Sequence, residues 1–262
     1  MNNLLHLVKI EWLKLSKYRA FKVLLGLFLI SLFGVNYVTY EVLSASMRID
    51  GASMLIGTPF QFPEVWHTVS YLSSFLLFIP GLIMILIMSN EYTYRTHRQN
   101  IIDGISRNQF INAKIALIFI ISICLAIVVF FVAAMFGLFC GGSLSFVKIE
   151  YIFYYLIQSI SYISIAFLLI ILFRRSGISI GVYFLYAFVL EEILVALLNR
   201  LLSPIGYFLP LESADKLIPI HLSFVSGMNQ NIPDGVYFLI TSCVWITLSL
   251  WYCKYKFGKD DL

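Results

Sequence analysis

Six long apolar runs constrain this chain more than any other feature of its sequence. Each run is close to the roughly 20 residues that an α-helix needs to cross a ~30 Å hydrocarbon core. Their apolar character is continuous rather than alternating, which favours helices over a β-barrel. The sequence therefore predicts an all-α integral membrane protein with one transmembrane domain, residues 1–262. The predicted spans are residues 21–40, 69–89, 113–139, 151–173, 177–198 and 236–252.

Composition agrees with a chain that has lipid as its main solvent. The sequence is 60% hydrophobic, only 12% charged, and has a mean hydropathy of +0.90. A soluble globule of this composition would expose far more hydrocarbon than water tolerates. The net charge of +4 is better explained by membrane orientation than by nucleic-acid binding. The four cysteines and four histidines show no spacing typical of a metal site. Pro80 should kink the second span.

Basic residues predict the orientation. Of the 18 lysines and arginines, only Arg48, Lys148, Arg200 and Lys216 fall on one side of the six predicted spans. The other side carries both termini and is rich in basic residues, so the positive-inside rule makes it cytoplasmic. We expect a multi-pass protein of the bacterial cytoplasmic (inner) membrane. The basic residues on that side are Lys9, Lys14, Lys17, Arg19, Lys22, Arg95, Arg98, Arg107, Lys114, Arg174, Arg175, Lys254, Lys256 and Lys259.

Two segments outside the spans have patterns of their own. In residues 1–20, Leu5, Val8, Trp12 and Leu15 recur at helical spacing among basic residues, and no signal-peptide cleavage pattern follows. This pattern predicts an amphipathic helix in the inner membrane interface, or else an ordinary basic flank. Residues 199–235 are apolar but repeatedly broken by proline and glycine, which predicts short re-entrant helices at the outer side before the last span.

The longest predicted internal cytoplasmic connection, residues 90–112, carries the clearest local signals. Ser106 and Gln109 form an S-x-x-Q capping box, which predicts a helix start. Asp103-Gly104 just before it is a turn signal. Glu91 and Arg95 are spaced as an i,i+4 ion pair, so the second span is predicted to continue as a charged helix. The segment is longer than a plain connection needs, which indicates either a docking surface or an extension that only clears the headgroups.

This connection resembles the segment between the second and third spans of ABC-2-type transporter permeases. In that family a Glu, an Arg-Thr pair, and a Gly-x-Ser-Arg followed by an aromatic residue and a Lys recur. The resemblance implies a coupling helix that fits a groove on a separate ATPase, and Arg98 is assigned to the same surface. The matching positions here are Glu91, Arg95, Thr96, Gly104, Ser106, Arg107, Phe110 and Lys114.

The sequence contains no G-x-x-x-x-G-K-[ST] phosphate loop. We therefore expect this chain to be no enzyme by itself and to bind no cofactor, with ATP and Mg²⁺ on two copies of a cytoplasmic ABC ATPase partner. The leading hypothesis is the permease subunit of an exporter for an amphipathic, lipid-like or peptide substrate. The alternative is a carrier not driven by ATP, or a membrane anchor for a cytoplasmic partner.

Two further features lie in the fifth span. Glu191 and Glu192 are ionisable residues in an apolar run, which indicates either a translocation path or a position at the outer interface. Gly177 and Gly181 form a G-x-x-x-G face, which lets helices approach closely. In the resembled family spans one and five meet across a permease dimer, so this face is assigned to contact with a second permease copy, a homodimer or close paralogue. Packing within the chain is the alternative.

Overall fold

The computed structural model describes residues 2–46, 58–202, 204–219 and 233–259, and the part it describes is helical throughout, without strands. Five helices are long and apolar enough to cross a membrane, and a bent pair brings the number to six. The predicted all-α membrane fold is therefore confirmed at the level of spans. The long helices are α2 (Arg19–Ser46), α7 (Arg107–Phe139), α8 (Glu150–Phe173), the run α9 (Ser176–Leu185), η1 (Tyr186–Leu190) and α10 (Glu191–Leu202), and α13 (Gly235–Lys259).

The bent pair consists of α4 (Val65–Ser74) and α5 (Phe78–Thr93), which meet at 46°. Pro80 lies in the first turn of α5 and has no amide hydrogen to give to the carbonyl of Leu76, four residues earlier. Leu76 lies in the break between the two helices, so the predicted kink is present one turn before the proline.

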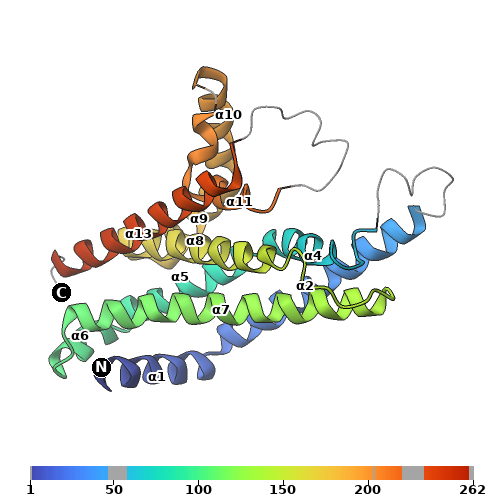
Figure 1. Ribbon diagram of the computed structural model, residues 1–262. Helices are drawn as coiled ribbons and strands as arrows, with labels where there is room; N and C mark the ends of the chain where they lie inside the picture. The colour runs from blue at the N-terminus through green and yellow to red at the C-terminus, as the bar shows by residue number, and fades with distance from the viewer. Residues whose placement is uncertain (1, 47–57, 203, 220–232, 260–262) are drawn as a thin grey trace.

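α8 forms the centre of the bundle and packs against α4, α5, α7, α9, α11 and α13. Within its most apolar stretch, 67% of the residues are buried inside the chain, against 17% for α2 and for the run of α9, η1 and α10. The peripheral helices therefore expose most of their apolar side chains, as lipid-facing helices do. In Figure 1, α10 stands away from the bundle.

Both chain ends lie at the same end of the bundle, beside α6 (Thr96–Ile102) (Figure 1). We call this the terminal end. The first helix there, α1 (Asn2–Lys17), packs along α7. At 1.5 Å per residue the 33 residues of α7 extend roughly 50 Å, which exceeds a ~30 Å hydrocarbon core. α7 can thus span the bilayer and still carry a polar first turn beyond it.

The opposite end holds two short helices, η2 (Ile205–Phe208) and α11 (Pro210–Asp215). α11 is buried against α8 and α13, and its Asp215 carboxylate accepts hydrogen bonds from Gln158 Nε2 at 2.6 Å and Tyr162 OH at 3.0 Å. Short broken helices were predicted for residues 199–235. Residues 203 and 220–232 of that prediction lie outside the described residues.

Candidate functional site

The connection between α5 and α7 folds into a compact hairpin, residues 91–114, which we call the α6 hairpin. α5 ends at Thr93, and Arg95 adopts a left-handed backbone conformation with φ of 53°. Residues other than glycine seldom adopt it, and the chain turns sharply here before α6 begins at Thr96. The predicted i,i+4 ion pair between Glu91 and Arg95 is wrong, because the helix that would align them stops between the two.

The second turn of the hairpin follows the predicted capping box. Ser106 Oγ accepts a hydrogen bond from the Gln109 amide at 3.3 Å, and Gln109 Oε1 accepts one from the Ser106 amide at 3.0 Å. Gly104 supplies a positive φ of 92°, and the Ile105 amide closes the turn on the Asn100 carbonyl at 3.0 Å. The predicted turn and capped helix start are confirmed.

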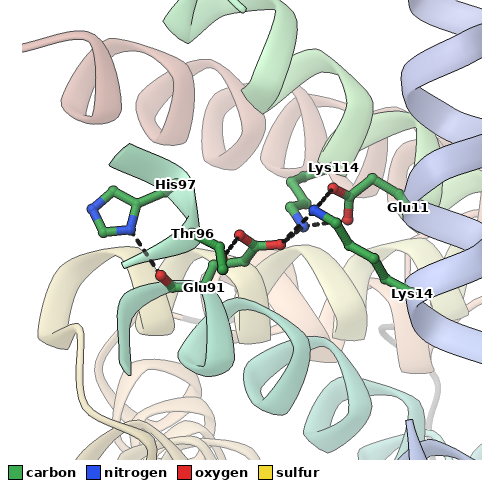
Figure 2. A network of polar contacts seen from close by, with 6 residues as sticks. All are labelled: Glu11, Lys14, Glu91, Thr96, His97 and Lys114. Atoms are coloured by element: carbon green, nitrogen blue, oxygen red, sulfur yellow. Dashed lines mark hydrogen bonds and ion pairs between the residues drawn. The ribbon is translucent and has the colours of Figure 1, made fainter. Parts of the chain in front are cut away.

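A group of four charged side chains, three of them buried, holds the hairpin against α1, and we call it the ion cluster: Glu11, Lys14, Glu91 and Lys114 (Figure 2). Lys114 Nζ lies 3.0 Å from Glu91 Oε1 and also pairs with Glu11 Oε2. Lys14 Nζ lies 3.3 Å from Glu91 Oε1 and 3.1 Å from Glu11 Oε1. Each carboxylate thus contacts both ammonium groups.

The charges of the ion cluster balance, which explains why Glu11, Glu91 and Lys114 can be buried while Lys14 stays partly exposed to solvent. Lys114 is 0% exposed, Glu91 5% and Glu11 6%. Removing such ions from water costs several kcal/mol each, and only close, mutually compensating contacts offset that cost. Burial favours the neutral amine of Lys14, yet Glu11 and Glu91 raise the pKa of Lys14 above its ordinary value. All four groups therefore belong to one unit that joins α1, α5 and α7.

α6 is attached to the same unit. Thr96 Oγ1 donates a hydrogen bond to Glu91 Oε2 (Figure 2). His97 Nδ1 lies 2.8 Å from the Glu91 carbonyl oxygen, so this nitrogen carries the proton and donates. Glu91 therefore fixes the first turn of α6 through its side chain and through its backbone.

A third contact ties the hairpin to the last helix. The ring of Phe110 is buried and stacks on Phe257 of α13, with centroids 5.3 Å apart and an interplanar angle of 16°. Arg107 Nη1 donates to the Gly258 carbonyl at 3.0 Å. The hairpin is thus held by α1 and by α13, helices that begin and end the described chain.

The outer surface of the hairpin is exposed and mixes charge with apolar side chains. Ile102 is 83% exposed and Tyr94 74%. Arg95 and Arg98 are exposed beside them. Two large apolar side chains with cationic neighbours on a braced helix form a suitable docking surface.

The eight residues assigned to coupling from the sequence thus separate into two groups. Those on the surface or half-buried are Arg95, Arg98, Gly104, Ser106 and Arg107, and those that are buried are Glu91, Phe110 and Lys114. The expectation that Phe110 contributes to an exposed surface is wrong, because its ring packs on Phe257. Glu91 and Lys114 act inside the chain, where they position α6.

Sequence reasoning missed Glu11, Lys14, His97 and Phe257. One signal for Glu11 was available. It is the sole acidic residue among the first twenty, and it falls between Val8 and Leu15 on the apolar face of the amphipathic helix. A carboxylate on an apolar face needs a buried partner of opposite charge.

At the other end of the bundle, Glu191 follows the π-helical turn η1 and is 3% exposed. Its Oε1 accepts hydrogen bonds from the backbone amides of Leu211 at 2.7 Å and Glu212 at 3.0 Å. Glu191 thus caps α11. Glu192, the next residue of α10, is exposed.

Gly177 and Gly181 lie on an exposed side of α9. Apart from the adjoining residues and the nearby backbone of α9 itself, none of the described residues has an atom within 4 Å of a Cβ added at either glycine. This part of the chain therefore does not use the glycine face for its own packing.

A family model described as an ABC-2 family transporter protein matches residues 7–190, more than two thirds of the sequence. The chain therefore belongs to the ABC-2 family of transporter proteins. The matched region includes the whole ion cluster and the α6 hairpin. No curated protein matches the sequence. As a member of this family the chain is a multi-pass permease subunit of an ABC transporter, a transport component and not a catalyst, in a family that generally works with a cytoplasmic ATPase.

Proposed function

We propose that the α6 hairpin is the coupling element through which a separate ABC ATPase drives this permease. The observation that carries the proposal is a short exposed helix braced from two directions, by the ion cluster on α1 and by Phe257 on α13. A braced helix transmits a displacement to the spans, whereas a loose loop would absorb it. The exposed surface of Ile102, Tyr94, Arg95 and Arg98 is the part that contacts the ATPase.

In this proposal the terminal end faces the cytoplasm, and α1 lies in the inner membrane interface. The working assembly contains two ATPase subunits, which bind ATP and Mg²⁺, and a second permease copy that meets this one at Gly177 and Gly181. The cargo is an amphipathic, lipid-like or peptide substrate moving outward. Glu191 and Glu192 lie along its path, and the described part of residues 199–235 dips into the outer leaflet.

The coupling role is tested by co-expressing the chain with the candidate ABC ATPase encoded nearest to its gene. Arg98→Glu combined with Ile102→Ala changes only exposed side chains, so the permease should fold normally and lose ATPase co-purification and permease-stimulated ATP hydrolysis. Lys9→Glu, at an exposed position of α1, is the matched control and should retain both. Unchanged co-purification and hydrolysis in the double variant would refute the coupling surface. If the ATPase co-purified with the unaltered chain but its ATP hydrolysis were not stimulated by that chain, the result would support the anchor alternative instead.

A further inference from the structure

A groove lies between α8 and α13. It encloses about 380 Å³ and is lined by Leu168 and Leu169 of α8, by Tyr186, and by Trp245, Leu248 and Tyr252 of α13. All these residues lie within helices that meet the length and composition of membrane spans. The groove therefore opens toward lipid.

The lining of the groove offers few free hydrogen-bonding groups to a polar occupant. Three polar groups of the wall already have partners: Trp245 Nε1 donates to the Phe208 carbonyl at 2.9 Å, Ser249 Oγ donates to the Ile246 carbonyl at 2.9 Å, and the Tyr186 hydroxyl bonds to Glu191. At roughly 30 Å³ per water-sized group, the groove has room for about a dozen methylene groups. A hydrocarbon chain can pack against this apolar wall without loss, whereas water would lose hydrogen bonds there.

One end of the groove is positively charged. α8 and α13 both run toward the terminal end (Figure 1). Lys256 lies one helical turn beyond Tyr252, and Arg175 follows the last residue of α8 by two positions. The sequence has no acidic residue from 151 to 190 or from 235 to 259, so neither α8 beyond its first residue, α9 nor α13 supplies a carboxylate to neutralise them. Basic residues at the interfacial end of a groove between spans are a recurring site for anionic headgroups.

We infer that this groove binds one acyl chain of an anionic phospholipid from the leaflet on the side of the chain termini, with the headgroup phosphate at Arg175 and Lys256. The apolar wall selects hydrocarbon, and the positive charge at its end selects an acidic headgroup over a zwitterionic one. The bound lipid completes the packing between α8 and α13. This inference does not depend on the coupling proposal, because it involves neither the α6 hairpin nor an ATPase.

The test is native mass spectrometry of the full chain purified in detergent and titrated with phosphatidylglycerol or phosphatidylcholine of the same acyl chains. We expect a retained phosphatidylglycerol and much weaker retention of phosphatidylcholine. Arg175→Gln combined with Lys256→Gln should weaken phosphatidylglycerol binding roughly 30-fold, since each basic residue contributes about fivefold near an anionic headgroup. Phosphatidylcholine binding should not change.

Two further variants separate the groove from general attraction. Lys254 lies on the same helix, about 160° around its axis from Lys256, so Lys254→Gln should leave phosphatidylglycerol binding within twofold. Leu168→Trp fills the groove and leaves the charges in place, and it should reduce retention of the lipid. Equal retention of the two lipids by the unaltered chain would overturn the inference. So would a loss in Lys254→Gln as large as that in the double variant.

Discussion

At Lys114 a fully buried ammonium group contacts two carboxylates that come from different helices. The four charges of the ion cluster sum to zero, so the removal of either lysine leaves excess negative charge on two buried carboxylates. This makes single and paired substitutions behave differently.

Lys114→Met should destabilise the chain by about 3–5 kcal/mol, because Glu11 and Glu91 are then left with Lys14 as their only cation. Lys114→Met combined with Glu91→Gln removes one charge of each sign and should recover a large part of that loss. Thermal unfolding in nanodiscs, followed by tryptophan fluorescence, measures both. If the single variant were no less stable than the double, charge balance would not be what holds the cluster.

Glu191 permits a similar separation of structure from transport. Glu191→Leu leaves the buried amides of Leu211 and Glu212 without an acceptor, which costs about 1–3 kcal/mol for each unpaired group. Glu191→Gln keeps an acceptor oxygen and should cost less. Transport measured in proteoliposomes, alongside thermal stability, distinguishes the two roles. A Gln variant of normal stability and normal flux would remove Glu191 from the translocation path and leave it only the capping of α11.

Among the elements, α7 begins where local sequence specifies it. Ser106→Ala should cost about 1 kcal/mol and should raise amide hydrogen exchange in the first turn of α7, because the Gln109 amide loses its acceptor. Asn108→Ala, at an exposed position of the same turn, is the matched control and should alter exchange little. Equal exchange in the two variants would mean that tertiary contacts, not the cap, fix this helix start.

The elements also show what the sequence could and could not predict. Apolar run length and the S-x-x-Q spacing are local properties, and both gave correct helices. The end of α5 at Thr93 was missed because the Glu91 and Arg95 spacing is compatible with a longer helix. In the structure Glu91 bonds instead to Lys114 and to Lys14, which are 23 and 77 residues away in the chain. No periodicity reports such contacts, so surface and interior could not be told apart within the hairpin.

At the scale of the whole molecule, α2 and the run from α9 to α10 leave most of their apolar surface outside the bundle. Such faces contact either lipid or a second copy of the chain. The glycines of α9 offer a way to distinguish these two partners, because their substitution does not disturb a contact among the described residues.

Gly181→Leu should leave the stability of the isolated chain within about 0.5 kcal/mol, as expected for surface substitutions away from special features. If two copies meet at this face, the added side chain should shift the population from dimer to monomer in nanodiscs, as measured by single-molecule photobleaching. Gly235→Leu, also in open surroundings, serves as the control. An unchanged dimer fraction in Gly181→Leu would exclude this face as the interface.

The ion cluster also has a consequence for how the protein is made. Glu11 precedes its partner Lys114 by 103 residues, so α1 leaves the ribosome long before the ammonium group that it will bury exists. Until α7 is synthesised and inserted, the Glu11 carboxylate has to remain hydrated, so α1 stays undocked at the membrane surface. Insertion of the third span is therefore the step in biogenesis that lets the first helix dock.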